Sequence, residues 1–314
     1  MNDVIVDAHA HVFRRLRGRI GSGEVAGLKQ GRALVAGREE QVLPPFPGPT
    51  RFTVETLLAH MDWAGVGKAV LLQGPFYGED NSYVRKAVRE LPGRFIGAAY
   101  LDPWEKPARR KFASLVKRPE FRAVKIECSE PTGLLGLHPG ARLAAVGLDW
   151  LWGGMEQYGL VLVLDLGAVG SRSYQTADVR EIAERHPRLR IVIPHLGQPG
   201  LALETDPALR TAWIEQIDLG RLPNVWFDCA ALPAKFAGEE YPYPSVDRYL
   251  REAFERIGPE KVMWGTDVPG LLVHATYPQL VRLGQLHTQS LTADQQALFM
   301  GRTARAVFGA ARIL

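Results

Sequence analysis

Residues 4–12 read Val-Ile-Val-Asp-Ala-His-Ala-His-Val. An apolar, β-branched run that leads into His9 and His11 predicts a short buried strand. Residues two apart on a strand project to the same face, so both imidazoles point at one spot. Two neutral imidazoles that converge are suited to binding a divalent metal, and the alternative is a pair of hydrogen-bonded structural histidines. The end of this first strand is therefore a candidate metal site.

Further apolar runs follow the first strand at regular intervals. They predict strands at 68–72, 95–101, 121–127, 160–166, 189–194, 225–229 and 261–265. Helical patterns are predicted at 53–65, 81–91, 107–117, 141–158, 176–186, 208–219, 246–257 and 292–308. Eight short, non-alternating strands in about 300 residues are typical of parallel strands buried on both faces, which favours an α/β fold, the closed (β/α)8 TIM barrel. An open doubly wound sheet is disfavoured because no G-x-G-x-x-G turn follows the first strand.

The segment 13–51 interrupts this rhythm. It is rich in Gly, Pro and Arg without a sustained period, so we expect a long irregular loop after the first strand that could act as a lid. Four arginines, Arg14, Arg15, Arg17 and Arg19, cluster in it. They form either a solvated basic loop or a clamp for a substrate carboxylate, for which we take Arg14 as the candidate. No linker divides the chain, so 1–314 is expected to be a single domain.

The composition narrows the class of protein. The chain has 314 residues, 46% of them hydrophobic, and its 38 Lys and Arg are interleaved with 34 acidic residues for a net charge of +4. We therefore expect a globular protein with no nucleic-acid partner, and no membrane span because no apolar run approaches about 20 residues. Two cysteines and the lack of a signal peptide predict a cytoplasmic protein. Apolar residues near Trp150 would favour a homo-oligomer if they were exposed.

Ionisable residues follow the apolar runs of six predicted strands. In chain order they are Asp7, His9 and His11; Lys125 and Glu127; Asp165; His195; Asp228; and Asp267. The active site of such a barrel lies at the carboxyl ends of its strands, and a buried charge there needs a metal, a partner or a cavity. Lys125 is open to three interpretations: an ion pair with Glu127 or Asp165, a binder of a substrate carboxylate, or a packed side chain. Asp7 and Asp228 are interpreted as structural supports, and His274 is a further pocket candidate.

Three motifs together carry a resemblance to a known family. They are Val-Asp-Ala-His-Ala-His at 6–11, Ile-Pro-His-Leu-Gly at 193–197 and Trp-Gly-Thr-Asp-Val-Pro at 264–269. In this order and spacing the chain resembles the amidohydrolase superfamily, in the amidohydrolase-related branch. That branch includes aminocarboxymuconate-semialdehyde decarboxylase, aromatic-acid decarboxylases and lactone hydrolases of the pyrone-dicarboxylate type. The resemblance implies that His9, His11 and Asp267 ligate one divalent metal, usually zinc, and that His195 acts as an acid/base or orients the attacking water.

The chain departs from this pattern at the end of the fifth strand. The metal-binding decarboxylases carry a histidine ligand there, and this chain has Asp165. Asp165 could still ligate, and two histidines with two aspartates would shift the preference from zinc towards Mn, Mg or Fe. The other interpretation is loss of the metal, because some lactone-cleaving relatives work without one.

These residues predict a hydrolase of a small lactone, ester or amide that carries a carboxylate. A metal would activate water, Asp267 would accept its proton, and His195 would polarise the carbonyl or protonate the leaving group. Lys125, Glu127, Arg14 and His274 are the expected substrate-binding residues. The alternatives are a metal-dependent non-oxidative decarboxylase of an aromatic or unsaturated acid, and an inactive binding barrel.

Overall fold

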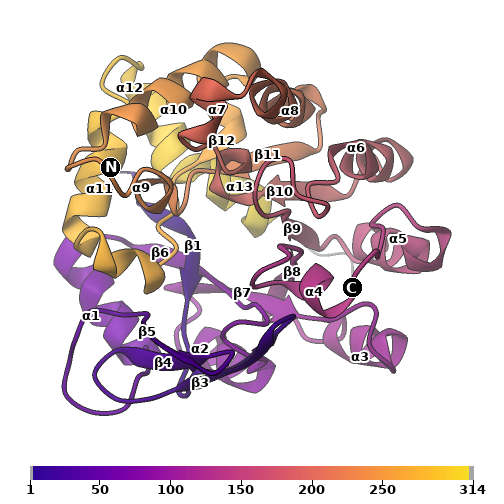
Figure 1. Ribbon diagram of the computed structural model, residues 1–314. Coiled ribbons are helices and arrows are strands. Elements are labelled where there is room, and N and C mark those ends of the chain that lie inside the picture. The colour runs from indigo at the N-terminus through magenta and orange to yellow at the C-terminus, as the bar shows by residue number, and fades with distance from the viewer. Residues whose placement is uncertain (1–2, 311–314) are drawn as a thin grey trace.

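A computed structural model describes residues 3–310 and has a barrel of eight parallel strands (Figure 1). The strands follow one another around the barrel: β1 (Val6–His11), β6 (Lys68–Leu72), β7 (Phe95–Tyr100), β8 (Phe121–Glu127), β9 (Val161–Asp165), β10 (Arg190–Ile193), β11 (Val225–Asp228) and β12 (Val262–Met263). The barrel closes where Ala8 donates its N–H to Trp264 O at 3.1 Å and the Asp267 N–H bonds to His9 O at 2.7 Å. The predicted (β/α)8 TIM barrel is thus confirmed.

Helices connect and cover the strands (Figure 1). They are α1 (Val54–Ala64), α2 (Asn81–Glu90), α3 (Ala108–Leu115), α4 (Leu134–Leu137), α5 (Asp149–Gln157), α6 (Thr176–Arg185), α7 (Ala202–Thr205), α8 (Pro207–Ile217), α9 (Leu232–Lys235), α10 (Pro244–Ile257), α11 (Tyr277–Leu286), α12 (Ala293–Ala297) and α13 (Thr303–Gly309). Helix α1 begins and ends as its sequence predicts, because the Thr53 side chain accepts from Thr56 N–H and Gly65 takes the left-handed conformation. An apolar cluster inside the barrel continues onto Phe308 of α13, opposite the strand ends that carry the ionisable residues.

The segment 13–51 is not the irregular loop that its composition predicts. It folds into an antiparallel sheet of four strands, β2 (Arg17–Ile20), β3 (Gly23–Gly27), β4 (Arg32–Val35) and β5 (Arg38–Gln41). Short strands joined by glycine-containing turns explain why no long period was visible. Strand β2 also bonds to the loop after β6, where Arg19 N–H reaches Pro75 O at 2.9 Å. This small sheet is therefore fixed to the rim of the barrel.

Two predicted helices are shorter than expected. The pattern at 141–158 forms a helix only from Asp149, because residues before it bond to the neighbouring segment instead: Leu143 N–H donates to Gln175 Oε1 at 3.0 Å and Arg142 pairs with Asp178. The pattern at 292–308 is interrupted at 298–302. There the backbone of Gly301 packs against β1, and a Cβ on it would lie 2.3 Å from Val4 O.

Helix α11 was not predicted from the sequence, and neither were the four-residue helices α4, α7 and α9. Helix α11 begins at a capping box in which Thr276 and Gln279 each bond to the other's backbone, a T-x-x-Q signal that is present in the sequence. The homo-oligomer contact was predicted only for exposed residues near Trp150; Leu148, Leu151 and Trp152 are buried in the core, and Trp150 is half-buried. In the described part of the chain, none of the helices combines the length and the apolar character that a membrane span requires.

Candidate active site

A cavity of about 500 Å³ opens at the carboxyl ends of the strands and gathers most of the predicted site residues. Its polar lining comprises His11, Tyr77, Lys125, Glu127, Ser129, Thr132, Asp165, His195, Gln198, Lys235 and Asp267. His9 lies just beneath His11 and Asp267 and is fully buried. Six strand ends that are distant in sequence thus meet in one place, as a closed barrel requires.

Asp7 anchors the two strands that carry the histidines and Asp267. Its buried carboxylate accepts the His9 N–H at 3.0 Å, the Thr266 hydroxyl at 2.6 Å and the Tyr277 hydroxyl at 2.8 Å. Burial raises the pKa of Asp7 to about 6, against the opposing effect of these hydrogen bonds. Asp7 therefore has the structural role that the sequence predicts, since it joins the end of β1 to the loop after β12.

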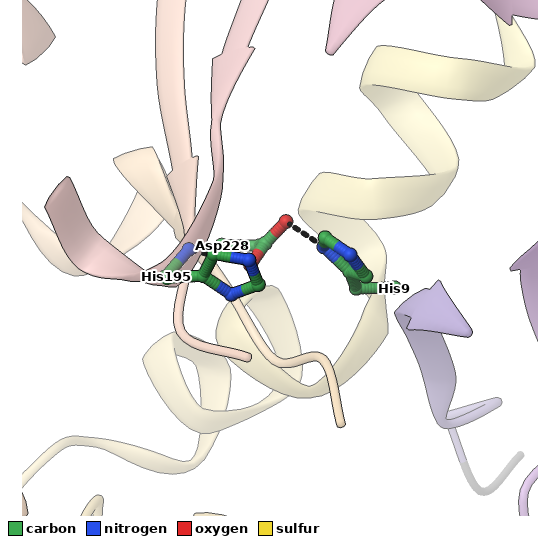
Figure 2. A group of neighbouring side chains, drawn as sticks. All are labelled: His9, His195 and Asp228. Atoms are coloured by element: carbon green, nitrogen blue, oxygen red, sulfur yellow. Dashed lines mark hydrogen bonds and ion pairs between the residues drawn. The ribbon is translucent and has the colours of Figure 1, made fainter. Parts of the chain in front are cut away.

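The Nδ1 atoms of the two β1 histidines already have hydrogen-bond partners within the protein. His9 Nδ1 lies 3.0 Å from Asp228 Oδ2, a contact that Figure 2 shows, and His11 Nδ1 lies 3.0 Å from the Leu72 carbonyl oxygen. Both partners are acceptors, so each Nδ1 carries the proton and each Nε2 presents a lone pair. Burial lowers the pKa of both imidazoles, which keeps them neutral at pH 7.

Asp267 completes a set of acceptors that requires a cation. Its Oδ1 lies 3.0 Å from His11 Nε2 and 3.5 Å from His9 Nε2. Burial raises the pKa of Asp267, but its contact with the His11 ring and the other neighbouring imidazoles outweigh burial and hold this pKa well below the usual range. Two imidazole lone pairs and a carboxylate oxygen, all within 4.8 Å of one another, form a three-residue group that could bind a divalent metal.

Asp165, for which the sequence left a role as fourth ligand open, lies outside this three-residue group and contacts His195. Its Oδ2 lies 3.0 Å from His195 Nε2, and its Oδ1 accepts from Gly167 N–H at 3.1 Å and from Gln198 Nε2 at 3.0 Å. Both oxygens of the Asp165 carboxylate therefore have hydrogen-bond partners outside the His9, His11 and Asp267 group. Burial raises the pKa of Asp165, but the charge and hydrogen bond of His195 outweigh it and lower that pKa well below its usual range.

His195 is held as an imidazolium by this pairing. Its Nδ1 faces the Ala230 carbonyl oxygen at 3.1 Å, so both ring nitrogens meet acceptors. Burial lowers the pKa of His195, but the negative charge and hydrogen bond of Asp165 outweigh burial and raise it to about 9. The backbone supports this placement with a left-handed turn at 195–198, where φ lies between 51° and 65°. Non-glycine residues seldom adopt this conformation, and such strain is typical of functional sites.

Lys125 forms an ion pair with Glu127, which is one of the three interpretations that the sequence left open. The ammonium Nζ lies 3.1 Å from Glu127 Oε2 and 3.4 Å from His9 Nε2, and its side chain is 3% exposed. Ser129 donates its hydroxyl to the other Glu127 oxygen at 2.7 Å. Burial lowers the pKa of Lys125, but the surrounding carboxylates outweigh it and raise it. Lys125 is thus a charged group that faces both the cavity and the first-strand histidines.

Two predicted substrate-binding residues lie away from the cavity. Arg14 pairs with Asp80 at 2.7 Å on the surface, where its side chain is 57% exposed, and His274 is half-buried behind Gly270 and Leu271, which do line the cavity. Among residues 3–310, the lining includes none from the segment 13–51. That segment borders the loop 74–77 instead, and this loop reaches the cavity.

Five polar lining residues were not predicted from the sequence: Ser129 and Thr132 of the loop after β8, and three others. Tyr77 packs against His11 with ring centroids 4.6 Å apart and ring planes tilted by 33°, Gln198 ends the left-handed turn, and Lys235 ends α9. All three lie in loops or at an element end beyond the strand pattern, so no periodicity marks them. The sequence predicts Asp228 only as a structural support, whereas its carboxylate contacts the His9 ring directly and accepts the His195 backbone N–H at 3.1 Å.

The chain is similar to known proteins in both sequence and fold. A family model described as amidohydrolase matches residues 6–310. The chain is 27% identical to an L-fucono-1,5-lactonase of Burkholderia multivorans over 139 residues, which is 42% of this chain and about half (47%) of that protein. It is 25% identical to a D-galactarolactone isomerase of Agrobacterium fabrum over 78% of this chain and 75% of that protein. A Burkholderia multivorans amidohydrolase whose structure contains bound zinc superposes with a TM-score of 0.70 at 19% identity, over 98% of this chain and 100% of that one.

Proposed function

The chain belongs to the amidohydrolase family, and from this premise we propose that it hydrolyses a small lactone that carries a carboxylate. The observation that carries the proposal is the cavity itself, where the acceptor group of His9, His11 and Asp267 lies beside the His195–Asp165 ion pair. One part can activate water and the other can supply a proton, and ester-type hydrolysis needs both. The relatives named as a lactonase and a lactone isomerase support a lactone as the ester.

We further propose that His9, His11 and Asp267 hold one divalent metal, with zinc the first candidate. Neutral imidazoles and a carboxylate are ligands that zinc prefers, and three protein ligands leave a coordination position open. The groups that orient both rings, Asp228 and the Leu72 carbonyl, are the kind that accompanies metal-binding histidines. Mn, Mg or Fe remain alternatives. A metal bound there would supply Lewis acidity, lowering the pKa of water and polarising a carbonyl.

Asp267 is the proposed acceptor of the proton that the attacking water releases. Its side chain is 22% exposed, and only Oδ1 faces the two imidazoles, so Oδ2 is available to a water in the cavity. A carboxylate with a low pKa is a weak base by itself. The proposed role of Asp267 is to orient the water and hold its proton at Oδ2, and a metal held by His9, His11 and Asp267 would lower the pKa of that water.

His195 is the proposed acid for the leaving group. At neutral pH its ring carries both protons, so it can protonate the ring oxygen when the acyl carbon–oxygen bond breaks. The lactone then becomes a hydroxy acid, and the proton taken up by Asp267 balances the one that His195 donates. Asp165 remains ionised and holds the ring in position. The Lys125 ammonium, beside His9 Nε2, is placed to attract the carbonyl oxygen of the substrate.

A panel of lactones tests the proposal by proton release, with identification of the product by nuclear magnetic resonance. We expect ring-opened hydroxy acids, formed faster than in a blank without enzyme or with Asp267→Asn. Release of carbon dioxide from an aromatic acid would favour a decarboxylase, and formation of a rearranged lactone would favour an isomerase. No turnover of any of these substrates would contradict the hydrolase and favour a binding barrel.

A further inference from the structure

The charged side chains that line the cavity are paired, with one exception. Lys125 lies 3.1 Å from Glu127, His195 lies 3.0 Å from Asp165, and the acceptor group around Asp267 is the candidate metal site. Lys235 also lines the cavity and is half-buried. Within residues 3–310 it forms no ion pair, so its ammonium has no carboxylate to neutralise it.

Gln198 holds Lys235 in this position. The Lys235 ammonium donates to Gln198 Oε1 at 2.6 Å, and Gln198 Nε2 donates to Asp165 Oδ1 at 3.0 Å. Because the amide nitrogen bonds to a carboxylate, the amide oxygen must point the other way, towards the lysine. Gln198 lies at the end of the left-handed turn at 195–198, so this strained backbone fixes the position of Gln198 and, through it, of Lys235.

We propose that Lys235 and Gln198 form a subsite for a carboxylate that lies away from the scissile bond. The substrates would then be lactones of dicarboxylic acids, and hydrolysis would release a dianion. Lys235 is a specificity-determining residue in this proposal, which rests on the proposed lactone hydrolysis.

The balance of charge favours this assignment over the other cations. The lining contains the carboxylates of Glu127, Asp165 and Asp267, which repel an anionic substrate unless a cation is free to receive it. Lys125 and His195 pair with Glu127 and Asp165 and are assigned to the scissile ester, and Arg14 lies outside the cavity. The hydrogen-bond partner of Lys235 is the neutral amide of Gln198. A substrate carboxylate can therefore bind the ammonium without first displacing an acidic side chain. Charge-assisted hydrogen bonds of this kind are among the stronger ones in proteins.

The test compares two lactones of the same sugar, an aldonolactone with a hydroxymethyl group at C6 and an aldarolactone with a carboxylate there. We expect the wild type to prefer the aldarolactone in kcat/KM. Lys235→Met should raise KM for the aldarolactone by about 10- to 100-fold, the range for a lost hydrogen bond between charged groups, with kcat nearly unchanged. The aldonolactone should be unaffected, and Lys235→Arg should restore part of the preference. Lys117→Met, at an exposed lysine after α3, is the matched control.

Binding of the open-chain acids separates this inference from the proposed function. Isothermal calorimetry with an aldarate and the corresponding aldonate does not require turnover. If no lactone is hydrolysed but the wild type binds the aldarate more tightly and Lys235→Met loses that difference, the reaction is wrong and the subsite stands. If Lys235→Met leaves the preference for the acidic ligand unchanged, or the wild type shows no preference, the subsite is wrong whatever the reaction.

Discussion

Two histidine–aspartate pairs in the cavity have nearly the same contacts and opposite protonation. In one, His11 Nδ1 faces the Leu72 carbonyl at 3.0 Å and Nε2 faces Asp267 at 3.0 Å. In the other, His195 Nδ1 faces the Ala230 carbonyl at 3.1 Å and Nε2 faces Asp165 at 3.0 Å. Burial and the nearby Lys125 charge lower the pKa of His11, whereas that of His195 is raised to about 9.

The surrounding charges account for the difference. His195 feels the negative charges of Asp165, Asp267 and Asp228 together. His11 has a carboxylate that also serves His9 and is 22% exposed, compared with 3% for Asp165. Direct hydrogen-bond partners therefore do not by themselves decide the protonation of a buried histidine. The His11–Asp267 pair consists of two acceptors and can bind a metal cation, whereas the His195–Asp165 pair already contains a protonated imidazole.

The largest expected effect comes from removing each carboxylate in turn. Asp267→Asn should weaken zinc binding by more than about 100-fold and lower kcat/KM by about 1,000-fold, because it removes a ligand and the proton acceptor. Asp165→Asn should keep zinc affinity within a few-fold of the wild type, since Asp165 bonds to His195. Competition with a chromophoric chelator measures the affinities. Equal loss of zinc in both variants would restore Asp165 to the ligand set predicted from the sequence.

The second expected effect is on stability as a function of pH. The folded-state pKa of His195, about 9, exceeds the value near 6.5 of an unfolded histidine. The folded protein therefore binds this proton more tightly, so the stabilisation is complete below pH 6.5 and is lost as pH rises through 9. The free energy of unfolding should fall by about 3 kcal/mol over this window from this group.

Urea unfolding at pH 6 and pH 9.5 measures this change. His195→Asn should remove this part of the pH dependence, and asparagine also tolerates the left-handed backbone at that position. His11→Asn is the matched control, because the pKa of His11 is lowered and contributes nothing that is lost above pH 6.5. The same slope in His195→Asn and the wild type would show that His195 is not charged.

The strand pattern predicted where these residues lie but not which of them would meet. Asp165 and His195 each follow an apolar run, and parallel strands bring such ends to one face. Whether Asp165 turns to the metal group or to His195 depends on the left-handed turn at 195–198, which periodicity does not encode. In the folded chain Asp165 Oδ1 accepts two further hydrogen bonds, one from Gly167 N–H and one from Gln198 Nε2, and these hold the carboxylate beside His195.

The loop residues were beyond prediction for a related reason. Lys235 reaches the cavity because α9 follows a left-handed residue, Ala231, just after β11. The small sheet at 17–41 was not predicted either. Its strands have only four or five residues, which is too short to show a period, and the glycines between them and the prolines after them indicated a loop. Left-handed turns such as those at 195–198 and Ala231 are set by tertiary contacts. The sequence therefore predicted the strands of the barrel but not the loops and the small sheet at its rim.

A smaller effect should follow from the cation that lies between the two pairs. The Lys125 ammonium is 3.4 Å from His9 Nε2, so it competes electrostatically with a divalent ion at that nitrogen. Lys125→Met should tighten zinc binding by about 10-fold, which corresponds to about 1.4 kcal/mol. Lys235→Met, which removes a lysine bonded to Gln198 in the same cavity, should leave zinc affinity unchanged. Weaker zinc binding in Lys125→Met would show that the lysine supports the metal site.

The smallest effect is expected at Arg14, which the sequence placed with the substrate. Its guanidinium pairs with Asp80 on an exposed surface, so Arg14→Ala should change the free energy of unfolding by less than about 1 kcal/mol and leave KM unchanged. Lys235→Met provides the contrast, because the same assay with the acidic lactone should show its KM rise. If Arg14→Ala instead raised KM about 10-fold, the segment 13–51 would have to fold over the cavity when substrate binds. The basic loop would then be the lid that its composition predicts, and the His11 and His195 pairs would work in a closed site.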